Sequence, residues 1–119
     1  KFNFELSGLE DFNFPKNQFD LVSAQRVLPF LQSKESLVKV FEKIKISLKP
    51  NGIFAGHFFG PNDTWCKEKR EMTFVTESEI RELLKDMEIT KLQEFERDSQ
   101  TATGTPHHWH IFDVIAGKK

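Results

Sequence analysis

The most chemically suggestive stretch of the sequence is His107-His108-Trp109-His110, near the C-terminus. On an extended strand, side chains two residues apart point to the same side, so His108 and His110 would lie together. With His57 as a third nitrogen donor they could bind zinc, which takes histidine, cysteine and carboxylate ligands. No cysteine or carboxylate completes a recognised ligand spacing, however. We therefore assign no metal, and expect these residues to fill the edge of a sheet or to line a substrate pocket.

A second group of candidates follows the apolar run that contains His57. The connection after this run carries Asn62-Asp63-Thr64-Trp65 and then Arg70. A long polar connection between a strand and a helix often forms a lid or a substrate loop, although simple linker structure has the same composition. We predict that His57, Asp63, Trp65 and Arg70 lie on the substrate side of a binding site.

Short apolar runs between turn residues indicate the elements that position these groups. Residues 2–5 are strand-like, and residues 19–24 and 52–59 are typical of strands buried on both faces of a parallel sheet. Ser33 can cap a helix between the last two runs, and Pro50 and Gly52 would stop it. The apolar residues of this helix, spaced by its 3.6-residue period, are Leu37, Val40, Phe41, Ile44 and Leu48. Strand, helix and strand together predict a right-handed parallel crossover.

The second half of the chain predicts another helix and a hairpin. Thr76 and Glu79 have the spacing of a capping box, in which each side chain bonds the backbone N–H of the other residue. The buried face of that helix is predicted to hold Ile80, Leu83, Leu84 and Met87. Residues 89–98 and 109–116 are extended segments, and residues 99–106 between them have hairpin composition. We expect an antiparallel edge pair at the C-terminus.

These elements predict an α/β fold, a Rossmann-like and mainly parallel sheet with helices on both faces. Ligands of such sheets bind beyond the carboxyl ends of the strands, where loop amides and helix starts converge. Three segments follow strand ends in this chain, namely residues 6–12, 23–28 and 57–65. Binding residues are expected among them.

Several phrases in these segments occur together in a known order. They are Leu9-Glu10-Asp11-Phe12-Asn13-Phe14-Pro15, Phe19-Asp20-Leu21-Val22-Ser23-Ala24, Leu28, and Leu48-Lys49-Pro50-Asn51-Gly52-Ile53-Phe54. The ordered set resembles the second half of the class I S-adenosylmethionine-dependent methyltransferases, where FDLV enters the central strand and LKPNG is the turn into the next. The resemblance covers nearly all 119 residues. It implies that residues 1–119 are the C-terminal portion of a single methyltransferase domain.

The resemblance also implies a cofactor and residues that hold it. The adenine of S-adenosylmethionine would be flanked by the backbone amide near Leu9 and by acidic or polar side chains around Glu10. Its methionine part would lie along Ser23, Ala24 and Gln25, and its adenosine would pack near Leu28.

Two departures from the family pattern affect these expectations. Gly8 stands where family members commonly carry an aspartate, two residues before the Glu-Asp pair. The N-terminal strands with the glycine-rich loop and the ribose-binding acid would precede Lys1 and are missing here. Loop amides and that carboxylate supply much of the cofactor binding. We therefore expect the isolated chain to bind the cofactor weakly and to be inactive.

Composition narrows the partners. With 17 basic and 18 acidic residues the net charge is −1, so no global field recruits nucleic acid or an anionic membrane. No apolar run approaches the roughly 20 residues of a membrane span, and nothing resembles a signal peptide. The single cysteine, Cys66, forms no internal disulfide. We expect a cytoplasmic protein with a small-molecule partner.

Three functions fit these observations. The first is methyl transfer from S-adenosylmethionine to an unidentified small-molecule acceptor. The second is a non-catalytic, truncated Rossmann-like module that pairs its open sheet with another chain, for instance as a homodimer. The third, a dinucleotide-dependent oxidoreductase, ranks lower because no glycine fingerprint stands in these residues.

Overall fold

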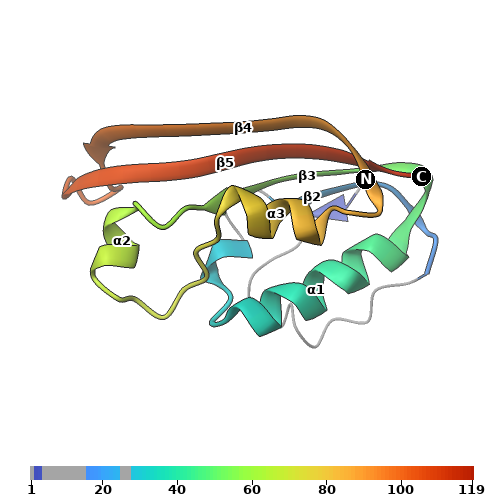
Figure 1. Ribbon diagram of the computed structural model, residues 1–119, viewed down its shortest axis with the longest axis horizontal. Coiled ribbons are helices and arrows are strands. Elements are labelled where there is room, and N and C mark those ends of the chain that lie inside the picture. The colour runs from blue at the N-terminus through green and yellow to red at the C-terminus, as the bar shows by residue number, and fades with distance from the viewer. Residues whose placement is uncertain (1, 4–15, 25–27) are drawn as a thin grey trace.

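The computed structural model describes residues 2–3, 16–24 and 28–119 (Figure 1). The predicted cofactor residues Leu9, Glu10 and Gln25 lie outside the described residues. The strands are β1 (Phe2–Asn3), β2 (Phe19–Ala24), β3 (Leu48–Phe59), β4 (Met87–Gln100) and β5 (Pro106–Lys118). The helices are a short 3-10 turn, η2 (Leu28–Phe30), and α1 (Lys34–Ser47), α2 (Thr64–Lys67) and α3 (Glu77–Leu83). No helix in these residues is long and apolar enough to cross a membrane.

The strands form one five-stranded sheet in the order β1-β2-β3-β5-β4. β1, β2 and β3 are parallel, as predicted, and β5 is antiparallel to both of its neighbours. The α/β fold and the C-terminal hairpin are therefore confirmed. The sheet is mixed: β4 runs in the same direction as β1, β2 and β3, and the strand that runs against them is β5, which inserts between β3 and β4. Its apolar residues Phe112, Val114 and Ala116 are buried there, which stabilises β5 inside the sheet.

The described helices α1 and α3 cover the same face of the sheet (Figure 1). Residues from both helices share one core cluster with Phe54 and Phe58 of β3. Apolar residues on the other face are more exposed to solvent. Ile53 is 43% exposed, and its neighbours Leu21, Ala55 and Ile115 are only half-buried. Within the described residues, the predicted helices on both faces are not found. We call this side of the sheet the open face.

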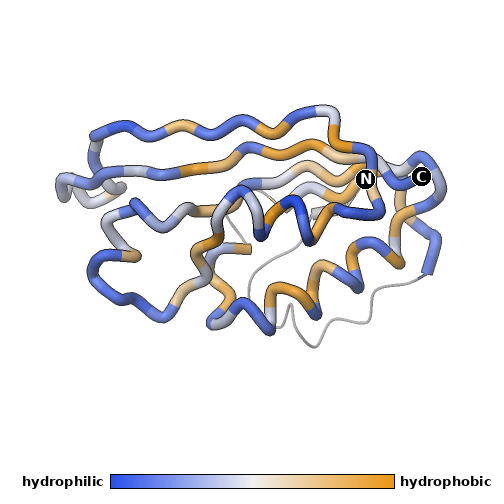
Figure 2. Tube along the Cα trace, in the orientation of Figure 1, coloured by the Kyte–Doolittle hydropathy of each residue, from blue (hydrophilic) through white to orange (hydrophobic). Residues whose placement is uncertain are grey.

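The helix patterns read from the sequence are confirmed at their starts. The Ser33 hydroxyl accepts the Ser36 N–H at 3.1 Å, and the Thr76–Glu79 capping box is complete. Hydrophobic positions recur along α1 between hydrophilic ones (Figure 2). This apolar stripe packs on the sheet, with the Phe41 ring edge-on to Phe54 at 5.0 Å between centroids. Element ends differ from the prediction, since Leu48 and Met87 begin strands and do not belong to helices. The hairpin strands are also longer than predicted.

Candidate functional site

One end of the sheet gathers most of the candidate residues. β2 and β3 both end there, and β5, being antiparallel to β3, starts there. The segment that leaves β3 forms the short helix α2, which contacts β5. Phe30, which follows β2, contacts the ring of Phe59 at 6.3 Å and that of Trp65 at 6.2 Å between centroids. The loops after two parallel strands therefore meet at the edge where α/β sheets bind ligands.

A pocket of about 450 Å³ lies between α2 and the tip of the β4–β5 hairpin. Its lining residues are Thr64, Trp65, Glu68, Arg70, Thr101, Ala102, Thr103, Thr105, Pro106, His107 and Trp109. Trp65 and Arg70, two of the predicted substrate residues, are brought together in it, with the guanidinium 5.3 Å from the indole ring. His107 and Trp109 belong to the cluster that was expected to line a pocket or fill the edge of the sheet, whereas the lining residues of the hairpin turn were missed. The Thr-rich composition of residues 101–105 indicated a turn and carried no sign of what the turn faces.

Asp63 sits beneath this pocket and is fully buried. Its Oδ1 accepts from His107 Nε2 at 2.7 Å and from the Trp65 backbone N–H at 3.0 Å. Its Oδ2 accepts from the His110 backbone N–H at 3.2 Å. The carboxylate therefore caps α2 and ties it to β5. Predicted on the substrate side, Asp63 does not itself line the pocket but holds two residues that do.

His57 lies elsewhere. It pairs in register with Asp113 of β5, and its Nε2 is 3.5 Å from Asp113 Oδ1, while Lys91 Nζ is 2.8 Å from Oδ2. It stands on the open face, as does its near neighbour Ile53, because alternate residues of a strand share one face. The zinc site that was considered and set aside above is not formed, since His108 and His110 share the β5 face of the core residue Phe112, whereas His57 stands on the open face.

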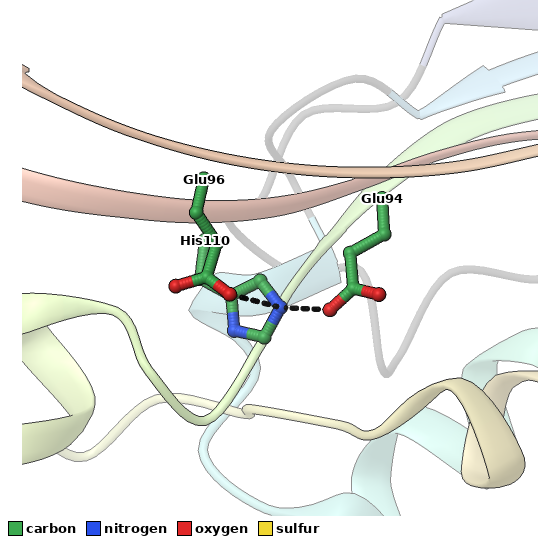
Figure 3. A group of neighbouring side chains, drawn as sticks. All are labelled: Glu94, Glu96 and His110. Carbon is green, nitrogen blue, oxygen red and sulfur yellow. Dashed lines mark hydrogen bonds and ion pairs between the residues drawn. The ribbon is translucent and has the colours of Figure 1, made fainter.

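His110 forms a group with Glu94 and Glu96 on the helix side (Figure 3). Its Nε2 is 2.6 Å from Glu94 Oε2 and 3.9 Å from Glu96 Oε2. Its Nδ1 accepts the Asn62 backbone N–H at 3.1 Å, so the ring proton is on Nε2 and points to Glu94. A metal at Nε2 would move that proton to Nδ1, directly against the Asn62 N–H. This hydrogen bonding disfavours a metal here.

His108 is the more exposed member of the cluster. As predicted, it shares a face with His110, and both rings approach Glu96. Its Nε2 contacts Glu96 Oε1 at 2.7 Å and its Nδ1 contacts Asp98 Oδ1 at 2.8 Å. Hydrogen bonds to Glu96 and then to Asp98 raise the pKa of His108, and the bond to His108 lowers the pKa of Glu96. These are surface interactions beside the pocket and not within it.

The described cofactor candidates lie at the end of β2. Ser23 is half-buried and pairs in register with Asn3 on one side and Ala55 on the other. Ala24 and Leu28 are fully buried and belong to the hydrophobic core. Ser23 and Ala24 thus stand at the carboxyl end of a parallel strand, the position where a ligand is expected. Phe30, which follows them along the chain, contacts Trp65 of the pocket lining.

Comparison with known proteins agrees with this arrangement. Residues 1–56 match the model of a methyltransferase domain family. A SAM-dependent methyltransferase from Methanosarcina mazei has 20% identity and a TM-score of 0.71, over 92% of this chain and 64% of its own. These findings support the predicted resemblance of the chain to the class I methyltransferase family. No curated protein matches the sequence.

Two further methyltransferase structures hold S-adenosylhomocysteine. The N-methyltransferase NodS of Bradyrhizobium japonicum has 16% identity and a TM-score of 0.58, over 89% of this chain and 50% of its own. The 1,6-didemethyltoxoflavin-N1-methyltransferase of Burkholderia thailandensis has 18% identity and a TM-score of 0.65, over 93% and 48%. At these identities the likeness shows the methyltransferase fold. The chain spans about half to two thirds of the length of these three proteins.

Proposed function

We propose that this chain serves S-adenosylmethionine-dependent methyl transfer to a small-molecule acceptor. The observation that carries the proposal is the pocket beside Trp65 and Arg70, which is formed by the segment that follows β3 and by the tip of the β4–β5 hairpin. The family match over residues 1–56 includes the end of β2, where Ser23 and Ala24 are placed. Both of the neighbours that hold S-adenosylhomocysteine are named as N-methyltransferases, and one of them also has the small molecule 1,6-didemethyltoxoflavin bound, which supports this class of substrate.

In this proposal the two ends of the site have different tasks. Ser23 and Ala24, with Leu9, Glu10, Gln25 and Leu28, hold S-adenosylmethionine, which supplies an electrophilic methyl group. The loop after β3 positions the acceptor. Trp65 forms an apolar wall of the pocket, and the Arg70 guanidinium lies over the Trp65 ring. Methyl transfer needs an acceptor atom in line with the methyl group, so positioning and exclusion of water supply much of the rate enhancement.

We further propose that residues 1–119 form the later portion of one methyltransferase domain and act in the cytoplasm. The coverage of 48–64% of the three neighbours supports the first point. The near-zero net charge and single cysteine support the second. On this proposal the residues that complete the cofactor site lie outside this chain, which by itself binds S-adenosylmethionine weakly.

Calorimetric titration with S-adenosylhomocysteine tests the proposed function in the complete protein. Saturable binding is expected, and Ser23→Leu should weaken it at least tenfold because the larger side chain fills the strand end where the cofactor is placed. Thr90→Leu, a substitution of the same kind on exposed β4, is the matched control and should leave affinity unchanged. Absence of saturable binding in the complete protein would contradict the proposal.

The open face favours a second candidate, a non-catalytic module that associates with another chain. Ile53 is exposed there beside half-buried Leu21, Ala55 and Ile115. Such a surface is stabilised by a partner, which for a homodimer is a second copy. Light scattering separates the two candidates. A concentration-dependent homodimer without cofactor binding would favour the module, and a monomer that binds S-adenosylhomocysteine would favour the enzyme.

A further inference from the structure

The geometry points to a recognition role for the pocket beside Trp65: we propose that it binds a neutral, planar ring that carries an N–H or O–H donor. In this proposal His107 Nδ1 accepts the hydrogen bond from that donor. The inference rests on the proposed function, because the ring is taken to be part of the methyl acceptor. It specifies the chemical class of that acceptor.

The shape of the pocket favours a flat ring. Three aromatic rings of the lining contact one another. The ring centroids are 4.6 Å apart for Trp65 and His107, 5.4 Å for Trp65 and Trp109, and 4.0 Å for His107 and Trp109. The Arg70 guanidinium, which also lines the pocket, lies over the Trp65 ring at 5.3 Å from its centroid. Aromatic side chains present large, rigid surfaces to which another ring can pack edge-on or with an offset. A planar ligand gains the most contact with such walls.

The charges around the pocket balance, which favours a neutral ligand. Arg70 Nε donates to Glu68 Oε1 at 3.1 Å, so the guanidinium already has a carboxylate partner. The hairpin side supplies threonine hydroxyls, and those of Thr101, Thr103 and Thr105 bond among themselves. A ligand with a full charge would lose hydration without gaining an uncompensated opposite charge.

His107 offers the directional contact. The residue is 4% exposed, and Asp63 Oδ1 holds its Nε2 at 2.7 Å. Because a carboxylate only accepts, the neutral ring carries its proton on Nε2 and keeps a lone pair on Nδ1. Among the described residues no hydrogen bond reaches Nδ1. Nδ1 is not a fully buried atom, and His107 lines the pocket, so a donor on a ligand in the pocket can reach it and form one ordinary neutral hydrogen bond.

The position of His107 indicates which part of the acceptor it contacts. Phe59, the last residue of β3, pairs with Ile111, and His107 lies four residues further along β5. At the rise of a β-strand this places His107 about 13 Å beyond the end of β3. Its contact is therefore with the distant end of the acceptor, away from the cofactor candidates at the end of β2. We assign His107 to specificity and not to proton transfer at the methylated atom.

The test uses two small probes and needs no cofactor. Phenol carries an O–H donor, and anisole has the same ring with that oxygen methylated. The chain contains two tryptophans, Trp65 and Trp109, so their indole N–H resonances in nitrogen-15 NMR spectra report on this pocket directly. Phenol should shift both resonances saturably and bind roughly 3- to 10-fold more tightly than anisole, the ratio expected for one neutral hydrogen bond.

His107→Gln separates recognition from folding. Its amide can still donate to Asp63, but the Nδ1 acceptor is removed, so the preference for phenol should fall to about one while the resonances stay dispersed. His108→Gln, on the opposite side of β5, should leave the preference unchanged. If His107→Gln does not fold, the phenol-to-anisole ratio in the unaltered chain decides.

Four results would overturn the proposal: no saturable shift, equal affinities, tighter binding of anisole, or a preference that survives His107→Gln. The titration is independent of S-adenosylhomocysteine binding, so a failed pocket and a failed methyltransferase assignment give different results.

Discussion

Replacing Asp63 with asparagine is expected to destabilise the protein, because the buried carboxylate accepts three hydrogen bonds from two sides. If the amide oxygen takes the place of Oδ1, the amide NH2 faces the His110 backbone N–H. If the amide is turned over, NH2 faces the Trp65 backbone N–H, even when His107 changes its tautomer to accept. Either orientation leaves two donors facing each other in a fully buried place. Asp63→Asn therefore loses at least one bond and gains an unsatisfied donor.

The magnitude follows from the type of bond. A hydrogen bond to a charged group contributes about 1.5–3 kcal/mol, and an unsatisfied buried donor costs about 1–3 kcal/mol. Since the two estimates partly describe the same loss, we expect Asp63→Asn to lower the free energy of unfolding by roughly 3 kcal/mol. For a chain of 119 residues this corresponds to a fall in Tm of roughly 10 °C.

Urea unfolding, followed by circular dichroism, measures this change. Asp98→Asn is the matched control, because Asp98 also contacts a histidine but its side chain is 89% exposed. The control should unfold at nearly the same urea concentration as the unaltered protein, since exposed ion pairs contribute little. A free energy of unfolding for Asp63→Asn within about 0.5 kcal/mol of the unaltered value would refute the reasoning, because surface substitutions produce changes of that size.

Two other predictions concern the histidines near this carboxylate. A Cβ atom at Gly60 would overlap the His110 ring, so Gly60→Ala should cost about 1–3 kcal/mol in unfolding experiments. Gly117→Ala, whose nearest contact would be 3.9 Å away, should be tolerated, and equal effects of the two substitutions would contradict this packing. NMR titration should find the pKa of His108 above its ordinary value and closer to it in Glu96→Gln. Because the folded-state pKa of His108 is raised, its protonated ring contributes to stability fully below the unfolded-state pKa of about 6.5, and the contribution is lost as pH rises through the folded-state value. An unchanged His108 pKa in Glu96→Gln would show that the bond to Glu96 does not cause the shift.

Much of the secondary structure was predictable because its causes are local. Ser33 and the Thr76–Glu79 pair mark helix starts through bonds that span three residues. The apolar run at Phe19–Ala24 is long enough for one buried strand, and the Thr-rich turn before Pro106 closes a hairpin. Each of these interactions is complete within a short segment, so composition and spacing identify it. The family resemblance rests on the same short segments in their order.

The strand order of the sheet, and which of its faces carry helices, were less predictable. Nothing local distinguishes a β5 that pairs at the edge from a β5 that inserts between β3 and β4, since both leave the hairpin intact. The insertion depends on Phe112 and Val114 finding a core made by α1, α3 and β3. The sequence predicted helices on both faces of the sheet, whereas the described helices lie on one. An apolar strand residue such as Ile53 does not indicate whether a helix packs on its face, because that packing depends on distant residues.

By itself the sequence determined the α/β elements, the hairpin and the likeness to methyltransferases, and it singled out Trp65 and Arg70, which the structure places in one pocket. Only the tertiary structure decided that His57 belongs to the open face, and that Asp63 is a buried acceptor beneath the pocket. Strand register decides the first point, since a shift of one residue moves a side chain to the other face. Contacts between residues more than 40 positions apart decide the second, because Asp63 meets His107 only after the hairpin has folded back on α2.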